Sequence, residues 1–210
     1  MKPRLAILIS GRGSNMAALL KAAQAENWEA EVSLVLSNKP LAGGLKTAAE
    51  HGIKTAVLDH RAFRGRRGDF DAQLAEVLQD QKIDLVILAG FMRILGPNFT
   101  RPFSGRILNI HPSLLPLYPG LDTHQRAIDA GDSVAGCTVH LVDETLDGGK
   151  PLAQAKVPIL PGDDAEALAA RVLVEEHQLY PRVVREFIDS RFKIGMDPAA
   201  SSGSVVEVEK

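Results

Sequence analysis

The chain has 210 residues, of which 45% are hydrophobic and 24% charged, and its formal net charge is −2. This composition is typical of a single globular domain with a well-buried core. The small net charge gives no bulk attraction to nucleic acid, and no apolar run reaches the roughly 18 residues that cross a bilayer. We therefore expect one folded domain over residues 1–195, with neither a nucleic-acid nor a membrane partner.

The first half of the chain alternates short apolar runs with helical patterns. The runs show no polar alternation, which is typical of parallel strands buried on both faces. They predict strands at residues 5–10, 32–37, 55–58, 85–89 and 107–110. Helical spacing of apolar residues predicts helices at residues 16–23, 41–52 and 70–81, the second ending at Gly52. Alternating strands and helices predict an α/β fold with a doubly wound, mostly parallel, Rossmann-like sheet.

The pattern changes after residue 120. A short helix is expected over residues 123–130, followed by two alternating strands at 134–143 and 151–159. The turn Asp147-Gly148-Gly149 favours an antiparallel pairing of these strands. A long C-terminal helix should begin with a capping box of Asp163 and Glu166, and Pro181 should bend or split it. Residues 196–210 show no spacing of apolar residues that would let a helix or strand bury one face. We therefore expect a disordered tail there.

The glycine-rich stretch "SGRGSNM" at residues 10–16 lies between the first strand and the first helix. Free N–H groups at such a helix start can hold a phosphate. The stretch has Met16 where a dinucleotide fingerprint has glycine, and it has no lysine for a Walker A loop. A single phosphate is therefore favoured over NAD or ATP. The alternative is a tight turn in which Ser14 or Asn15 caps the helix.

Asn109 and His111 stand two positions apart at the end of the fifth strand, so their side chains share a direction. A glycine pair follows Asp147 in a later turn. These three residue types fit acyl transfer: the histidine moves a proton, the aspartate orients and stabilises the imidazolium, and the amide donates to an oxyanion. The alternative is a structural histidine and an ordinary turn residue.

The sequence offers no protein nucleophile for this chemistry. The single cysteine, Cys137, lies in an apolar run, and no serine stands in a nucleophile elbow. The attacking group would then belong to the substrate, for example an amine. The other histidines lack metal-ligand spacing, so we expect no metal. One unpaired thiol suits a reducing compartment, and we expect a cytoplasmic location.

Five segments in order, "ISGRGSN", "LAGFMRIL", "LNIHPSLLPLYPG", "VHLVDETLDGGK" and "RVLVEEHQLYP", resemble the phosphoribosylglycinamide formyltransferase family of de novo purine synthesis. The resemblance covers residues 4–193 and makes residues 1–195 a formyltransferase catalytic domain. It implies that the amine of glycinamide ribonucleotide attacks the formyl group of 10-formyltetrahydrofolate, a co-substrate. Small-molecule substrates and a monomer or weak homodimer are the expected partners.

The resemblance also implies residue roles. Asn109, His111 and Asp147 would be catalytic, with the aspartate stabilising protonated His111. The ribonucleotide would contact Gly13, Ser14, Asn15, Leu173, Val174, Glu175 and Glu176. Folate would contact Arg67, Met92, Arg93, Ile94, Leu95, Asn109, Asp143, Glu144, Thr145, Leu146 and Asp147, partly through backbone groups.

Several alternatives stay open beside these roles. Arg93 and Glu176 read alone are surface charges, and the basic stretch "FRGRRGD" at 63–69 is either a solvated face or a lip for the anionic folate tail. Asp122 stands where some relatives have a histidine, which leaves an accessory role there open. A different folate-dependent formyl-transferring or formyl-hydrolysing enzyme on the same fold, or a non-enzymatic sensor, are the competing functions.

Overall fold

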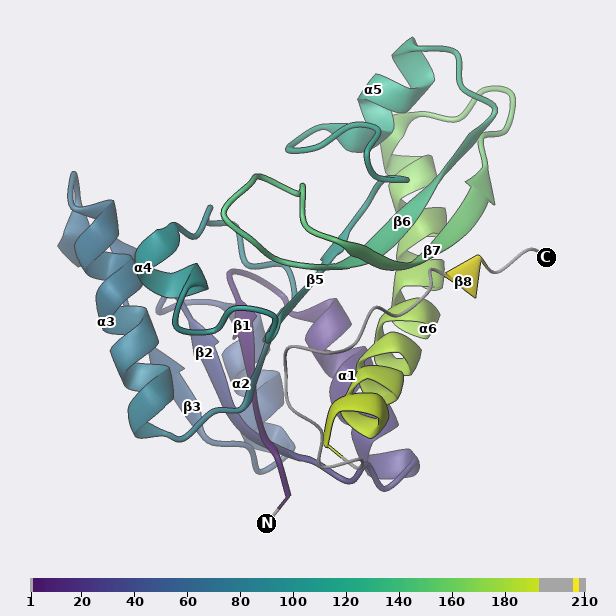
Figure 1. Ribbon diagram of the computed structural model, residues 1–210. Helices are drawn as coiled ribbons and strands as arrows, with labels where there is room; N and C mark the ends of the chain where they lie inside the picture. The colour runs from purple at the N-terminus through teal and green to yellow at the C-terminus, as the bar shows by residue number, and fades with distance from the viewer. Residues whose placement is uncertain (1, 193–205, 208–210) are drawn as a thin grey trace.

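The computed structural model describes residues 2–192 and 206–207, and a mixed sheet of eight strands forms its centre (Figure 1). The strand order across the sheet is β3-β2-β1-β4-β5-β6-β7-β8. Neighbours among the first five strands pair in parallel, which confirms the prediction from the apolar runs. The strands are β1 Arg4–Ile9, β2 Glu31–Ser37, β3 Thr55–Val57, β4 Leu85–Leu88, β5 Ile107–His111, β6 Val134–Leu141, β7 Pro151–Pro158 and β8 Val206–Glu207.

Helices cover both faces of the sheet, as Figure 1 shows for α1 and α6 against α3. Successive residues of β1 are buried on opposite faces: Leu5, Ile7 and Ile9 face α1 and α6, whereas Ala6 and Leu8 face α3. Each fully buried leucine or isoleucine contributes about 1.5–3 kcal/mol to folding stability. Because both faces of β1 are covered by helices, both carry apolar residues. The helices are α1 Ser14–Ala25, α2 Gly43–Glu50, α3 Arg67–Asp80, α4 Pro97–Thr100, α5 Thr123–Asp129 and α6 Ala165–Phe192, with a 3₁₀ turn η1 at His60–Phe63.

The strand order reverses its direction between β1 and β4, where a doubly wound sheet opens a crevice at its carboxyl edge. Ser10 lies just after β1 and is 4% exposed. Its hydroxyl accepts a hydrogen bond from the Met92 backbone N–H at 2.8 Å and donates to Asn38 Oδ1 at 2.6 Å. The loops that follow β1, β2 and β4 are therefore tied together at this edge.

The second half of the sheet is antiparallel. β6 pairs antiparallel to β5 and to β7, which confirms the predicted antiparallel pair. β6 ends at Leu141, two residues earlier than predicted, so the connection runs through residues 142–150. α6 packs along the sheet, and its fully buried Tyr180 hydroxyl lies 2.9 Å from the Leu88 carbonyl oxygen and 3.0 Å from that of Leu108. One side chain thus connects α6 to both β4 and β5.

The start of α6 differs from the sequence prediction, and of the two effects predicted for Pro181, bending or splitting, the structure excludes splitting. The predicted capping residue was wrong: Asp164 Oδ1, not Asp163, accepts the N–H of Ala167 at 2.8 Å. Asp163 instead forms a salt bridge with Arg171 at 2.7 Å. Pro181 does not split the helix, which continues from Ala165 to Phe192. Packing of the buried helix face outweighs the one backbone hydrogen bond that proline removes.

No described helix is long and apolar enough to cross a membrane. Within the described residues, no group of three or more His, Cys, Asp or Glu side chains could hold a metal ion. The expected disorder of residues 196–210 lies outside the described residues, apart from the two residues of β8, which pair in parallel with β7.

Candidate active site

His111 ends β5 and is buried, with 6% of its surface exposed. Its Nε2 lies 2.9 Å from the backbone carbonyl oxygen of Tyr118. A carbonyl oxygen can only accept, so Nε2 carries a hydrogen in either protonation state. The other ring nitrogen, Nδ1, lies 3.5 Å from Asp147 Oδ2. Nδ1 is therefore the atom of His111 at which a proton can be taken up and released.

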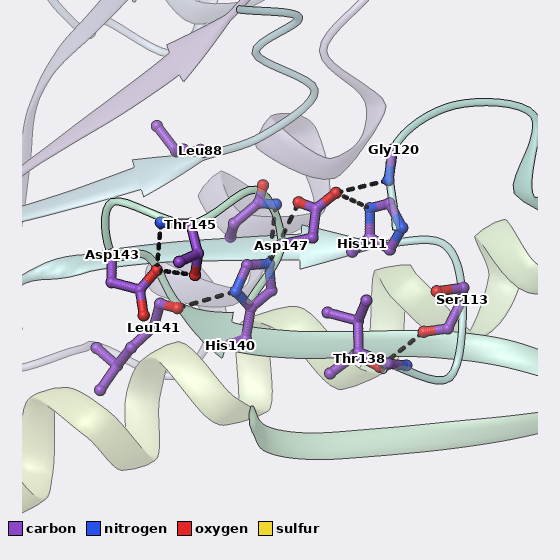
Figure 2. Close-up of polar contacts among 12 residues, drawn as sticks. Leu88, His111, Ser113, Gly120, Thr138, His140, Leu141, Asp143, Thr145 and Asp147 are labelled. Carbon is purple, nitrogen blue, oxygen red and sulfur yellow. Dashed lines mark hydrogen bonds and ion pairs between the residues drawn. The ribbon is translucent and has the colours of Figure 1, made fainter. Parts of the chain in front are cut away.

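Asp147 lies between two histidines in the loop after β6, as Figure 2 shows. Its side chain is 12% exposed, its Oδ2 accepts the Gly120 N–H at 2.9 Å, and its Oδ1 lies 3.9 Å from His140 Nε2. The backbone of Asp147 has a φ of 50°, which asparagine and aspartate tolerate better than most residues. The carboxylate is thus held at the end of β5, beside His111, by a backbone donor.

The loop that carries Asp147 passes very close to the end of β6. A Cβ on Gly149 would lie 1.8 Å from the Leu141 carbonyl oxygen, closer than any side chain permits. Only glycine fits at this position, which gives the Gly-Gly pair a physical reason. The approach brings the loop back over the sheet, where Asp147 meets His111.

Asn109 lies on β5 directly opposite His140 on β6. Its side-chain nitrogen, Nδ2, is 3.1 Å from His140 Nε2. His140 is 1% exposed, and its Nδ1 lies 2.9 Å from the Leu141 carbonyl oxygen. Burial lowers the pKa of His140 despite the nearby carboxylate of Asp147. Asn109, His111 and Asp147 are thus brought together, with His140 as a fourth member.

Hydrogen bonds from Thr138 on β6 and Gln154 on β7 hold the proline-rich loop after His111. The Thr138 hydroxyl donates to the Ser113 carbonyl at 2.6 Å and accepts the Leu115 N–H at 3.0 Å. Gln154 Nε2 donates to the Leu115 carbonyl at 2.8 Å, beside the cis Leu115–Pro116 peptide bond. This network fixes the loop whose Tyr118 carbonyl orients His111, and Figure 2 shows its contact between Ser113 and Thr138.

The glycine-rich loop leads directly into α1. The helix begins at Ser14, Gly13 occupies the capping position with a φ of 74°, and no side chain caps the helix. The alternative in which Ser14 or Asn15 serves as the cap was therefore wrong. A Cβ on Gly13 would lie 3.2 Å from the Cα of Gly44, so this turn is crowded as well as left-handed. The uncapped N–H groups stay open to an anion.

Asn15 and Glu176 form a buried pair, although 161 positions separate them in the sequence. Asn15 Nδ2 donates to Glu176 Oε2 at 2.7 Å, and Asn15 Oδ1 has no hydrogen-bond partner in the described structure. Burial raises the pKa of Glu176, and the bond from Asn15 opposes that shift. The prediction that joined these residues in one site agrees with their contact. The interpretation of Glu176 as a surface charge was wrong, because the residue is 7% exposed.

The residues expected at folate fall into exposed and buried groups. Met92 and Ile94 are 70% and 53% exposed, whereas Leu95 is 6% exposed and packs into the core beneath α3. Only backbone atoms of Leu95 can face a ligand. The Arg93 guanidinium lies 4.3 Å from the centre of the Phe70 ring. Arg93 is thus stacked on the buried Phe70 ring rather than freely solvated.

The remaining predicted contact residues lie on α3, in the Asp147 loop and on α6. Arg67, half-exposed at the start of α3, has its Nε 3.9 Å from Asp71 Oδ2. In the Asp147 loop, Asp143 Oδ1 accepts the Thr145 N–H at 2.7 Å, and Leu146 is 52% exposed. Glu144 pairs with Arg101 at 2.8 Å. On α6, Leu173 and Glu175 are half-buried and Val174 is exposed.

The matching family model, described as formyl transferase, covers residues 3–184. This range includes the glycine loop, the carboxyl edge of β5 and the Asp147 loop. The chain belongs to the formyl transferase family.

Relatives match this chain over most of its length. It is 44% identical to phosphoribosylglycinamide formyltransferase of Escherichia coli over 95% of this chain and 93% of that protein. A solved phosphoribosylglycinamide formyltransferase from Brucella melitensis is 51% identical, with a TM-score of 0.84 over 94% of this chain and 98% of the other. The trifunctional purine biosynthetic protein adenosine-3 of Drosophila melanogaster is 46% identical over 90% of this chain, which spans 14% of that protein.

Sequence reasoning missed three contributors to the site of this formyl transferase. His140 contacts Asn109, the Ser10 hydroxyl holds the Met92 backbone, and the backbone of Tyr118 and Gly120 orients His111 and Asp147. His140 stands in an apolar strand pattern, where a polar side chain was the only available signal. The contacts made by backbone atoms of Tyr118 and Gly120 could not be predicted, because they do not depend on the identity of a side chain.

Proposed function

We propose that this protein transfers a formyl group from 10-formyltetrahydrofolate to the amine of N1-(5-phospho-D-ribosyl)glycinamide, in de novo purine (IMP) biosynthesis. The products are the N-formyl ribonucleotide and tetrahydrofolate. The observation that carries the proposal is the meeting of Asn109, His111 and Asp147 at the carboxyl edge of β5, in a formyl transferase with near-full-length phosphoribosylglycinamide formyltransferase relatives.

The proposed reaction is a direct transfer between two bound substrates. The neutral amine forms a bond to the formyl carbon, the carbonyl electron pair moves to oxygen, and the bond from carbon to folate N10 then breaks. One proton leaves the attacking nitrogen and one reaches N10. His111 Nδ1 performs this exchange, because its Nε2 hydrogen is committed to the Tyr118 carbonyl. Asp147, 3.5 Å from Nδ1, stabilises the imidazolium that forms in between.

Asn109 acts on the charge that develops at the formyl oxygen. Its amide nitrogen has two N–H groups, of which one is directed at His140. The second is the proposed donor to the oxyanion. A single donor of this kind contributes about 10²–10³-fold to turnover in other acyl-transfer enzymes. Holding two substrates in register contributes at least as much, because it removes an encounter step.

The ribonucleotide phosphate is proposed to bind at the start of α1. Gly13, Ser14 and Asn15 offer uncapped N–H groups and the positive end of the helix dipole. Asn15 Oδ1 and the Glu176 carboxyl are buried polar groups with unused bonding capacity, suited to sugar hydroxyls. Leu173, Val174 and Glu175 precede Glu176 on the same helix and are proposed to line the same ribonucleotide site.

The folate co-substrate is proposed to lie between the loop at residues 92–95 and the loop at residues 143–147. The exposed side chains of Met92, Ile94 and Leu146 suit an aromatic ring system, and backbone groups of both loops are the proposed partners of its polar edge. Arg67 and the neighbouring basic residues of "FRGRRGD" suit the anionic glutamate tail. Asp143, Thr145 and Glu144 shape the second loop. No metal is part of the proposal.

The proposal extends to partners and location. Small molecules are the proposed substrates, the chain is proposed to act as a monomer or weak homodimer, and the place of action is the cytoplasm. The single, buried Cys137 suits a reducing compartment.

An absorbance assay of purified protein with 10-formyltetrahydrofolate tests the function. We expect release of tetrahydrofolate only when the glycinamide ribonucleotide is added, with one formyl group transferred for each folate released. Equal release without the ribonucleotide would indicate hydrolysis instead. No release under either condition would favour a binding or sensor protein and overturn the proposal.

A further inference from the structure

His140 lies at the centre of the site but belongs to none of the proposed proton-transfer steps. It is 1% exposed on β6 and stands directly opposite Asn109 of β5 in the antiparallel ladder. Side chains of directly opposed residues lie on the same face of a sheet, with their Cβ atoms about 4.5–5.5 Å apart. The register of β5 and β6 therefore forces these two side chains together.

The hydrogen-bond partners of His140 determine its tautomer. Its Nδ1 lies 2.9 Å from the Leu141 carbonyl oxygen, which can only accept, so Nδ1 carries the hydrogen. Burial lowers the pKa of His140, which favours the neutral ring. In the neutral ring Nε2 has a lone pair and no hydrogen. His140 consequently presents an acceptor, not a donor, to the active site.

That acceptor selects one end of the Asn109 amide. The amide nitrogen can donate to Nε2, whereas the amide oxygen cannot bond to a lone pair. The separation of 3.1 Å between Asn109 Nδ2 and His140 Nε2 is a hydrogen bond of this kind. Asp147 Oδ1, at 3.9 Å from Nε2, is beyond hydrogen-bond distance. Asn109 therefore holds this nitrogen of His140 in the described structure.

We infer that His140 is a positioning residue that fixes the orientation of the Asn109 amide by accepting a hydrogen bond from its nitrogen. The second N–H of the same nitrogen is thereby directed to the formyl oxygen. Without the acceptor, the amide can rotate about its terminal torsion and present its oxygen to the developing negative charge. The inference rests on the proposed function for the role of Asn109 as an oxyanion donor.

A double-mutant cycle on kcat tests whether His140 acts through Asn109. His140→Phe keeps a planar ring and removes the acceptor, and Asn109→Ala removes the donor. We expect His140→Phe to lower kcat about 10-fold or more, because part of an oxyanion donor worth about 10²–10³-fold is lost. The same substitution in an Asn109→Ala background should change kcat less than about twofold, since the group it positions is already absent.

The cycle distinguishes positioning from a merely structural role. Equal losses from His140→Phe in both backgrounds would overturn the inference, because they would show an effect independent of Asn109. Melting temperatures of all four proteins report any shared loss of folding. A full kcat in the Asn109→Ala single variant would refute the proposed oxyanion role of Asn109. The inference would then be overturned as well, by a result that differs from equal losses in the two backgrounds.

A second variant keeps the test valid if the phenylalanine variant does not fold. His140→Gln retains an acceptor oxygen that can reach the Asn109 amide. We expect its kcat to stay within about threefold of the wild-type value and its KM for both substrates to be unchanged. A loss as large as that of Asn109→Ala, in a folded His140→Gln protein, would contradict positioning through this hydrogen bond.

Discussion

The two ring nitrogens of His111 have different neighbours, and these give the nitrogens different proposed roles. A backbone carbonyl fixes the hydrogen on Nε2, and a carboxylate faces Nδ1. The ring is thus oriented from both sides, which leaves one exchangeable proton in a defined place. Asp147 is itself held by the Gly120 N–H, so the orientation extends into the backbone.

Replacing Asp147 by asparagine tests this arrangement at the scale of one atom. Asp147→Asn keeps the shape and an acceptor for Gly120 but removes the charge that stabilises the imidazolium. We expect kcat to fall by about 10² or more, with KM for the ribonucleotide changed little. Steady-state kinetics with both substrates provide the measurement. Asp129→Asn on α5 is the matched control, and near-normal turnover of Asp147→Asn would refute the assigned role.

Glu176 makes a pH-dependent contribution to stability of unusual sign. Burial raises its pKa in the folded protein above the ordinary 4.5, so the folded state binds the proton more tightly than the unfolded state. Stability from this group is present at low pH. It is lost as the pH rises from about 4.5 through the raised folded-state pKa, because the carboxylate is desolvated.

Glu176→Gln should remove that loss while keeping the bond from Asn15. We expect the free energy of unfolding of the variant, minus that of the wild type, to increase with pH across this window. Denaturant titrations at a series of pH values measure the difference. Glu186→Gln, at an exposed position of the same helix, is the matched control. The same pH dependence in both variants would show that the buried carboxyl is not its source.

At the scale of elements, the loop between β6 and β7 decides whether the site exists. It carries Asp147 from the far end of β6 back toward β5, and its close approach to Leu141 leaves no room for a side chain on Gly149. The loop geometry is therefore set by backbone contacts rather than by the proposed catalytic residues.

Gly149→Ala should move this loop. Its Cβ would lie 1.8 Å from the Leu141 carbonyl oxygen, so the backbone must shift. We expect a loss of about 1–3 kcal/mol in unfolding free energy and a fall in kcat as Asp147 moves from His111. Calorimetry and kinetics on the same sample check both. Gly43→Ala is the control, because a Cβ there meets nothing within 4 Å, and it should leave stability and kcat near wild type. Wild-type stability and kcat in Gly149→Ala would contradict the prediction.

At the scale of the whole molecule, α6 joins the two halves of the sheet. Its Glu176 reaches the start of α1, and its Tyr180 hydroxyl reaches carbonyls of β4 and β5. The proposed ribonucleotide site and the catalytic edge are therefore supported by one helix face. Rigid support of this kind keeps reacting groups in register.

Tyr180→Phe separates this support from chemistry. The variant keeps the packed ring and loses the hydroxyl bonds to Leu88 and Leu108. We expect the free energy of unfolding to fall by about 1–2 kcal/mol, because buried carbonyls lose a donor. With the helix still packed, kcat and both KM values should change less than about twofold. A large fall in kcat with unchanged stability would mean that Tyr180 acts on the site directly.

The elements were largely predictable because their signals are local. Uninterrupted apolar runs predicted parallel strands buried on both faces. The helix predicted to end at Gly52 ends at Glu50, and Gly52 follows its cap, His51, with a φ of 72°. The start of α6 was misassigned from Asp163 because two adjacent aspartates offer the same capping chemistry. The uninterrupted course of α6 past Pro181 depends on packing, which no local rule contains.

The sequence by itself determined the α/β architecture and pointed to Asn109, His111 and Asp147 as candidate catalytic residues, since side-chain period, strand-end position and family motifs are properties of a few neighbouring residues. Only the tertiary structure decided which partner each ring nitrogen has, that His140 faces Asn109, and that Asn15 meets Glu176 across 161 positions. Those contacts follow from strand register and from the packing of α6, which the whole chain fixes jointly. Short stretches of sequence thus supply the residue types of the site, and the fold of the whole chain sets the distances between them.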